Sequence, residues 1–536
     1  MVRLRRARRS GKRSSILDDE TIIEPSPPHS RGALRVVAGY PAPYRVGISN
    51  LGFQFLWGTM RQSRNISVER VFADSSHVTL ESGSSLASRP VLMFSISYEE
   101  DYINLVRMLH EAGVAPLRSK RGGRPLVIVG GPAVSANPAP LGQIVDAAAL
   151  GEGEGVLEGV MRVIGERGAR EVDALRDRDN GEILRDLAGL PGMYVPGFSR
   201  GTSFNAPLAI SRFPRSVVVT PRSAFPDTLV VESGRGCPGA CAFCLATSLY
   251  RPFRFMPLKG FEELLATLPA SVARIGLVST AVAANPDFVP IVKRLVSRGL
   301  KVSFSSLRAE DLDDEKIRLI ADAGTASVSL APESGSERLR YALGKRVPDE
   351  VYLAAASKLR AAGVVHFTLY LLVGCPDEGA TSLAETRVFM ERFKKAIRGS
   401  SFSVHVNPLV PKPWTPFQFF PMPEEGDLAE RQQAIEKMLR GLGLGVQLKS
   451  VRSGVRQALF STGDERMGSA VVLHVEEGLP WRKALKEAGV NERFPYETKG
   501  PETSFPWDEI SGPVHRGVLF KRFEALRNGA SPKEAL

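Results

Sequence analysis

Short apolar runs alternate with amphipathic stretches along the first part of the chain. Pro90–Ile96 and Pro125–Val129 are almost entirely apolar, which is typical of strands covered on both faces. Arg45–Ile48 predicts a further short strand, and Leu51–Met60 has apolar residues at helical spacing. Strands that alternate with helices favour a parallel sheet. We therefore expect a doubly wound, Rossmann-like α/β domain over residues 36–160.

Polar and glycine-rich turns follow the predicted strands of this domain. Gly130-Gly131 ends one strand, and Gly151-Glu152-Gly153-Glu154 follows another. The carboxyl ends of parallel strands share one edge of a sheet, and ligands bind at that edge. The domain has neither a G-x-G-x-x-G sequence after its first strand nor a Walker A sequence, so a dinucleotide or a nucleoside triphosphate is not favoured. We expect these turns to hold a different bulky ligand.

A second series of strands and helices predicts a partial (β/α)6 barrel of the TIM type over residues 226–425. Its predicted strands are Thr228–Val231, Arg274–Val278, Lys301–Phe304, Ser327–Leu330, His366–Val373 and Ser403–Val406. The site of such a barrel lies at the carboxyl ends of its strands. Residues 161–225 are predicted to be a linker, and residues 426–536 a small α+β C-terminal domain.

Basic residues are concentrated near the amino end. The 536-residue chain has 70 Lys and Arg against 58 Asp and Glu, a net charge of +12. Residues 1–14 hold seven of these cations and no acid, and several prolines follow, so we predict a disordered basic arm over residues 1–35. This arm is either a solvated tail or a handle for an acidic partner. No apolar run is long enough to span a membrane, so we expect a cytoplasmic protein.

Three of the four cysteines lie within eight positions. Cys237, Cys241 and Cys244 follow the first predicted barrel strand in a glycine-rich loop. Such crowding does not suit a disulfide framework in a chain of this length and points to a metal site. Three thiolates can hold three irons of a cubane cluster and leave one iron open. A structural zinc would need a fourth Cys or His nearby, and none follows within the next 100 residues. Cys375 is either a hydrogen donor or metal ligand facing the site, or a buried, inert thiol.

The Cys-x-x-x-Cys-x-Phe-Cys sequence after a barrel strand resembles the radical S-adenosylmethionine (radical SAM) superfamily. The resemblance implies that Cys237, Cys241 and Cys244 hold a catalytic 4Fe-4S cluster, whose open iron binds the amino and carboxylate groups of SAM. It also implies SAM contacts from the cysteine loop and the later strands. These contacts are Phe243, Ser305, Ser306, Glu333 and Arg338. A carboxylate can accept hydrogen bonds from the SAM ribose or ammonium group, and an arginine can pair with its carboxylate.

The doubly wound domain ahead of the barrel resembles the cobalamin-binding branch of that superfamily. The matching segments are residues 40–54, Gly130-Gly131-Pro132 and residues 146–154. The resemblance implies cobalamin contacts from Ser49, Asn50, Ser95, Ser97, Gly130, Gly131, Glu152 and Gly153, with Tyr98 as a catalytic candidate beside the lower face. The Asp-x-His-x-x-Gly sequence that supplies an axial histidine in methionine synthase-like domains is absent. We therefore expect base-off cobalamin without a histidine ligand.

The resemblance implies a cobalamin-dependent radical SAM C-methyltransferase, which uses two SAM molecules to methylate an unactivated sp3 carbon. The substrate that it suggests is a protein residue, the Cα of a glutamine in methyl-coenzyme M reductase, and the reductant is a ferredoxin or flavodoxin. One alternative is a cobalamin-binding radical SAM oxidoreductase or cyclase without methyl transfer. Another is an RNA-binding iron–sulfur protein, although the chain lacks the clustered aromatic and basic residues that stack bases.

Overall fold

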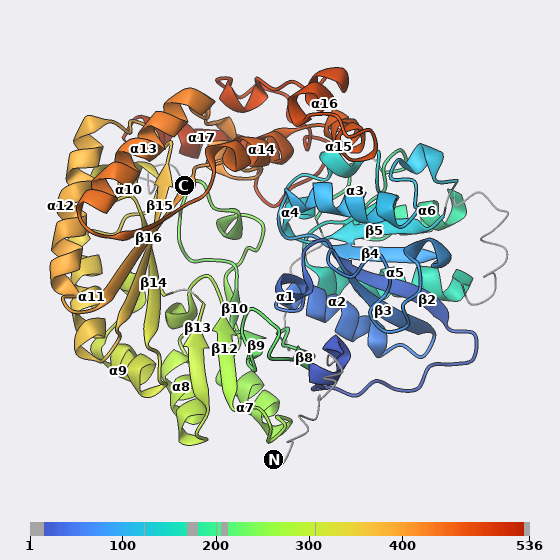
Figure 1. Ribbon diagram of the computed structural model, residues 1–536, viewed down its shortest axis with the longest axis horizontal. Helices are drawn as coiled ribbons and strands as arrows, with labels where there is room; N and C mark the ends of the chain where they lie inside the picture. Colours follow the sequence, from blue (N-terminus) through green and yellow to red (C-terminus); the bar gives the residue numbers. More distant parts are fainter. Residues whose placement is uncertain are drawn as a thin grey trace, which may run out of the picture.

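The computed structural model describes residues 15–122, 124–168, 181–199, 201–204, 213–305 and 307–529. Two α/β units lie side by side in it (Figure 1). The N-terminal sheet, blue to cyan, is on the right of the view, and the barrel strands, green to orange, are on the left. Helices near the carboxyl end, in red, extend along the top from one unit to the other.

The N-terminal unit is built on a six-stranded sheet in the order β3-β2-β4-β5-β6-β7. These strands are β2 (Leu34–Tyr40), β3 (Ile66–Phe72), β4 (Val91–Ser95), β5 (Leu126–Gly130), β6 (Ala147–Ala149) and β7 (Met193–Tyr194). All neighbours are parallel except β7, which runs antiparallel to β6. Every residue of β4 is buried, as expected for a strand with helices on both faces. The doubly wound fold is therefore observed.

Helices cover both faces of this sheet. They are α1 (Tyr44–Gly47), α2 (Leu51–Arg61), α3 (Asp101–Glu111), α4 (Pro132–Ala136), α5 (Gly153–Gly168) and α6 (Gly181–Ala188). The strand predicted at Arg45–Ile48 is wrong, because these residues belong to α1 and the turn after it. The Asp74 carboxylate accepts a hydrogen bond from the Tyr44 backbone N–H at 2.7 Å, which satisfies a free donor in the first turn of that helix.

The segment predicted as a linker, residues 161–225, begins inside the N-terminal unit. The end of α5, all of α6 and the edge strand β7 lie in it, and β7 pairs with β6 through Ala148 and Tyr194. Leu184 and Leu187 of α6 are buried in the core of this unit. The N-terminal unit therefore continues to about residue 195.

Residues 15–35 do not fit the predicted disordered arm. They form a 3-10 helix (Ile16–Asp19) and the strand β1 (Thr21–Ile22), which pairs with β8 (Val218–Val219). Glu20 binds the guanidinium of Arg70 at 2.7 Å, and both side chains are almost fully buried. This ion pair anchors the segment to β3. The cluster of basic residues at positions 1–14 lies outside the described residues.

The barrel strands form two parallel groups, β9-β12-β13 and β14-β15-β16-β17. Their bounds are β9 (Leu229–Glu232), β12 (Arg274–Val278), β13 (Lys301–Phe304), β14 (Ser327–Glu333), β15 (His366–Val373), β16 (Ser401–Pro408) and β17 (Gly445–Leu448). All six predicted strands are present. The seventh, β17, comes from the predicted C-terminal domain and pairs with β16, so that region completes the barrel sheet.

Helices cover the outer face of the barrel strands (Figure 1). They are α7 (Leu258–Ala266), α8 (Phe288–Ser297), α9 (Asp314–Asp322), α10 (Glu337–Ala342), α11 (Asp349–Ala361), α12 (Ala380–Ala396) and α13 (Glu425–Gly441). Alternate strand residues such as Leu369 and Leu371 pack against these helices in one continuous core. The residues between them, such as Thr368 and Tyr370, turn to the opposite face and are only partly buried.

In the described part of the chain, four α-helices follow β17 and join the two units. They are α14 (Val451–Thr462), α15 (Arg466–Glu476), α16 (Trp481–Glu487) and α17 (Arg516–Arg527). A single hydrophobic core contains Tyr102 of the N-terminal unit, Ala242 of the cysteine loop and Phe460 of α14. The rings of Tyr102 and Phe460 meet edge to face with centroids 5.5 Å apart. None of the helices in the described part of the chain is long and apolar enough to span a lipid bilayer.

The buried Glu20–Arg70 pair predicts a large stability effect at the amino end. Glu20→Ala leaves the Arg70 charge with Glu81 as its remaining carboxylate partner. Removal of one partner of a buried ion pair costs about 3 kcal/mol of the free energy of unfolding. Glu24→Ala is the matched control, because Glu24 pairs with Arg215 while 41% of its side chain is exposed, and its loss costs at most about 1 kcal/mol. Urea unfolding curves measure both changes, and equal effects would contradict the expectation.

Candidate active site

A cavity of about 650 Å³ lies between the N-terminal sheet and the first strands of the barrel. One wall is formed by the carboxyl ends of β4, β5 and β6 and by the turn between α1 and α2. This wall contains all eight residues expected to contact cobalamin: Ser49, Asn50, Ser95, Ser97, Gly130, Gly131, Glu152 and Gly153. They converge for a topological reason, because β3 and β4 lie on opposite sides of β2 and a crevice opens where the strand order reverses.

Local contacts fix the shape of this wall. Asn50 caps α2 by accepting a hydrogen bond from the Phe53 N–H at 2.9 Å, and its amide donates to the Ser97 hydroxyl at 3.1 Å. Gly131 has a φ of +114°, and a Cβ there would lie 2.4 Å from the Ile96 carbonyl oxygen. Only glycine therefore allows the backbone to follow this path beside the cavity.

The barrel supplies the opposite wall. It includes Glu232, Gly234, Arg235, Gly236, Tyr250, Ser279, Thr280 and Ser305. The Ser305 hydroxyl accepts a hydrogen bond from the Ser279 N–H at 3.2 Å and donates one to the Ser279 carbonyl at 3.0 Å. The Thr280 hydroxyl donates to the Gly236 carbonyl. The ends of β12 and β13 are thus tied together, and β12 is tied to the start of the cysteine loop.

The cysteine loop leaves β9 at this wall. Cys237, Cys241 and Cys244 are free cysteines of intermediate exposure. Burial of the thiol raises the pKa of Cys241 to about 12 and that of Cys244 above its ordinary value. A thiolate here needs a nearby positive charge, which iron would supply. Among the described residues, no group of three or more His, Cys, Asp or Glu side chains is placed to hold a single metal ion. A cubane cluster would instead place each thiolate on its own iron.

Glu333 ends β14 in a left-handed conformation, with a φ of +67°. Lys345 lies 3.2 Å from its carboxylate and also donates to the Ala331 carbonyl. Burial raises the pKa of Glu333. Burial also opposes the charge of Lys345, but Glu333, Tyr352 and Cys241 together outweigh it and raise the pKa of that ammonium. Lys345 and Glu333 therefore form a hydrogen-bonded pair beside the cysteine loop.

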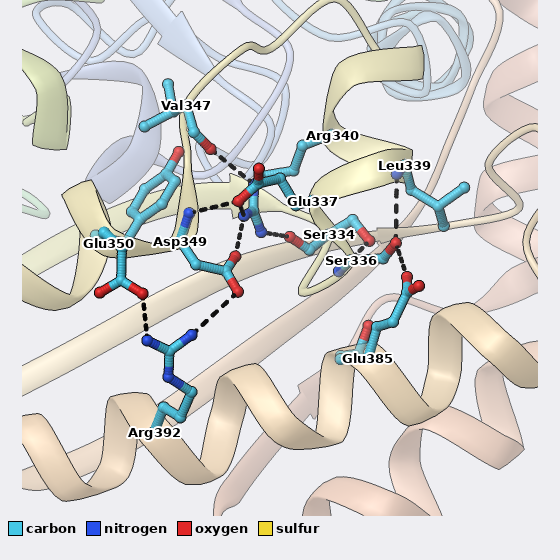
Figure 2. Close-up of polar contacts among 12 residues, drawn as sticks. Ser334, Ser336, Glu337, Leu339, Arg340, Val347, Asp349, Glu350, Glu385 and Arg392 are labelled. Carbon is cyan, nitrogen blue, oxygen red and sulfur yellow. Dashed lines mark hydrogen bonds and ion pairs between the residues drawn. The ribbon is translucent and has the colours of Figure 1, made fainter. Parts of the chain in front are cut away.

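Arg338, the expected carboxylate partner, is exposed and donates to the Asp377 carbonyl at 3.2 Å. The arginine that turns inward is Arg340, which is fully buried (Figure 2). It donates to the Ser334 carbonyl at 2.7 Å and the Val347 carbonyl at 3.1 Å, and it binds the Asp349 carboxylate. These contacts give Arg340 a structural role in holding the turn after β14.

Three further expected residues have different outcomes. Tyr98 is not on the cavity wall. Its hydroxyl donates a hydrogen bond to Glu100 at 2.8 Å and accepts one from Lys449 at 2.6 Å. The contact with Lys449, from the C-terminal region, holds the side chain away from the cavity. Phe243 packs partly buried against the core that joins the two units. Ser306 lies outside the described residues.

Arg235 joins the two walls of the cavity. Its guanidinium lies 2.7 Å from Glu232 in the barrel, and 3.1 and 2.6 Å from Glu152 and Glu154 in the N-terminal unit. Arg254 reaches Glu152 at 3.1 Å, because the antiparallel pair β10 (Gly234–Arg235) and β11 (Arg254–Phe255) sets the two arginines opposite each other. Burial opposes the charge of Arg235, but these carboxylates raise its pKa. Three carboxylates thus share two guanidinium groups across the interface.

Cys375 is 2% exposed and lies in the hydrophobic core that joins the units. Its thiol points to the Leu372 carbonyl, with the sulfur 3.8 Å from the oxygen. Burial raises its pKa well above the ordinary value. Of the two interpretations of this cysteine, the structure favours the packed, inert thiol.

Sequence reasoning missed Arg235, Arg254 and Lys345. Arg235 stands two residues before Cys237 between glycines, and Lys345 follows the α10 turn at Gly344, so both are close to expected site residues. Glu152 and Glu154 lie more than 80 positions before these arginines, and Glu333 lies 12 positions before Lys345 on the other side of α10, so no local pattern indicates those pairings.

Family models and a protein sequence match long segments of this chain. Residues 231–390 match the family model of the radical SAM superfamily, and residues 52–196 match that of the N-terminal region of radical SAM proteins. An uncharacterized protein of Methanocaldococcus jannaschii is 28% identical over 432 residues, which cover 80% of this chain and 88% of that protein.

Two solved structures are similar in part. The radical SAM methyltransferase TsrM from Kitasatospora setae, with tryptophan and a SAM analogue bound, is 14% identical, with a TM-score of 0.48 over 69% of this chain and 73% of its own. The cobalamin-dependent SAM radical enzyme OxsB, with aqua-cobalamin and SAM bound, is 14% identical, with a TM-score of 0.46 over 76% of this chain and 56% of its own. Through residues 52–196 and 231–390, the chain belongs to the radical SAM superfamily.

Proposed function

We propose that the chain is a cobalamin-dependent radical SAM C-methyltransferase. The observation that carries this proposal is the cavity shared by the glycine-rich edge of the N-terminal sheet and the base of the cysteine loop. When bound, the cluster and SAM supply hydrogen-abstracting radical chemistry, and cobalamin supplies a methyl group that can be delivered to carbon.

The residues of the cysteine loop fit an iron–sulfur cluster. Cys237, Cys241 and Cys244 would be its ligands. The Gly239 N–H lies 3.4 Å from the Cys237 sulfur, in position to donate a hydrogen bond to a thiolate. Backbone groups outside the loop hold it in place. The Ala242 N–H donates a hydrogen bond to the Leu343 carbonyl at 2.9 Å, and the Ala242 carbonyl accepts one from the Phe417 N–H at 3.0 Å. Such fixed backbone contacts keep the three sulfurs in place when iron binds.

One nitrogen of Arg308, unpaired among the described residues while the other guanidinium nitrogens bind Glu310, supports a SAM site next to this loop. The Nη1 group of Arg308 is buried and has no hydrogen-bond partner in the described part of the chain. It lies 3.9 Å from the position that a Cβ on Gly239 would occupy. A buried donor of this kind fits the carboxylate of SAM. Glu333, held by Lys345, is the acceptor for the SAM ammonium or ribose hydroxyl groups.

The cavity wall fits a corrin in its shape and chemistry. Glycines 130, 131, 151 and 153 lie along one side, where the backbone itself forms the surface. Gly153 faces open space, because a Cβ there would meet only Phe55, at 3.8 Å. No histidine is among the described residues that line the cavity. This composition supports the expectation of cobalamin without a histidine ligand.

The inner face of the barrel supports a polar substrate. Thr368 and Ser403 share a hydrogen bond at 3.2 Å, and Tyr370 and His405 lie beside each other with ring centroids 4.9 Å apart. These partly exposed side chains line strands whose carboxyl ends point toward the site. A peptide with exposed amide groups suits this face, so we propose an unactivated sp3 carbon of a protein residue as the target. Glutamine Cα of methyl-coenzyme M reductase is the specific candidate.

A labelled-methyl assay tests this function. The protein is reconstituted with iron, sulfide and hydroxocobalamin, reduced, and given SAM with a deuterated methyl group and a peptide that contains the target glutamine. We expect one trideuteromethyl group in place of one hydrogen on the peptide. Cys244→Ala abolishes the product because it removes a cluster ligand, whereas Cys375→Ala retains it. Cleavage of SAM without label on the peptide would favour an oxidoreductase or cyclase.

A cavity-filling variant tests the cobalamin site alone. Gly153→Phe places a phenyl ring in open space on the cavity wall, so we expect at least tenfold weaker binding of hydroxocobalamin with little change in stability. Gly426→Phe is the control, since Gly426 is an exposed glycine with open space around it on α13. Absorption titration of the corrin band measures both affinities. Equal affinities would place the corrin elsewhere.

A further inference from the structure

The last helix of the described chain contacts the cysteine loop through an arginine. Arg522 lies on α17, and its Nη2 group donates to the carbonyl of Ala240 at 3.2 Å. Ala240 precedes Cys241 directly. The helix is fixed there by Phe523, whose ring lies 6.0 Å from that of Phe419 and 6.4 Å from that of Phe417.

The charge of Arg522 has no carboxylate partner among the described residues. Only 6% of the residue is exposed, no ion pair in the described part of the chain includes it, and its Nε group is buried without a hydrogen-bond partner. Burial lowers its pKa. A buried guanidinium is costly unless an anion compensates it, so its position indicates an anionic group beside the loop.

A cluster on three thiolates is such an anion. It carries one negative charge when oxidised and two after it accepts one electron from a low-potential donor. Net charge and nearby hydrogen-bond donors set the reduction potentials of these clusters. A fixed cation beside the loop therefore stabilises the reduced form more than the oxidised form.

We propose that Arg522 supplies the counter-charge for the iron–sulfur cluster of the cysteine loop and thereby favours its reduced state. This inference rests on the proposed function only in requiring the cluster, because neither cobalamin nor a substrate enters it. Arg522 is a positioning residue: it contacts the Ala240 backbone and acts on the cluster through its charge.

The midpoint potential of the cluster tests this role. It is measured by dithionite titration followed by electron paramagnetic resonance, in the full chain without SAM or cobalamin. Arg522→Gln should shift the one-electron equilibrium at least tenfold toward the oxidised cluster, a change of about 59 mV. Arg522→Lys keeps the charge and should stay within about threefold of the unmodified protein. Lys521→Gln removes an exposed charge from the neighbouring position of α17 and should change nothing.

Iron content keeps the test decisive if a variant assembles poorly. Loss of iron in Arg522→Gln but not in Arg522→Lys would also support the counter-charge. Equal potentials in Arg522→Gln and Lys521→Gln at equal iron content would overturn it, as would equal losses in Arg522→Gln and Arg522→Lys. An unmodified chain that assembles no 4Fe-4S cluster would instead overturn the proposed function, and this role with it.

Discussion

The Arg235 guanidinium connects the cysteine loop to the N-terminal sheet, and the rest of the site depends on that connection. Its partner Glu152 lies in the turn after β6 and Glu154 in the first turn of α5, while Glu232 ends β9. All four side chains are less than a fifth exposed, so solvent screens their interaction weakly. Loss of one partner from such a buried group is strongly destabilising, because the remaining charges are left uncompensated. The position of Cys237 is thereby linked to the shape of the cavity wall.

Strand direction explains why one cavity can serve both units. Parallel strands in each unit place their carboxyl ends, and the polar turns that follow them, at one edge. The two edges face each other, with the cavity between them. The C-terminal helices join the two units through a hydrophobic core that includes residues of both units and of the cysteine loop. Arg522, on the last of these helices, brings a cation to the same loop.

Much of this fold is predictable from the sequence, because buried parallel strands have a strong local pattern. The bounds of β12, β13 and β15 coincide with the apolar runs that predicted them. The short edge strands β7 and β17 have no such pattern, since each depends on pairing with a strand already formed.

The site residues also divide into those placed by local turns, which the sequence predicts, and those placed by contacts with distant segments, which it does not. Turns at strand ends are local features, and the predicted glycines and serines do line one cavity. Spacing could not decide which of Arg338 and Arg340 turns inward, because that depends on packing of α10 against α12. Tyr98 was expected in the site because it follows β4, but its partners Lys449 and Gln457 come from segments more than 350 positions away.

The proposed function requires the cluster and the cobalamin to occupy a single site across Arg235. Pulsed electron paramagnetic resonance tests it most directly, on protein loaded with both groups and reduced so that the cluster and the cobalt each carry an unpaired electron. We expect a resolved magnetic interaction between the two spins, which weakens or broadens when Arg235→Gln loosens the interface. Two independent signals at full loading of both groups would contradict it.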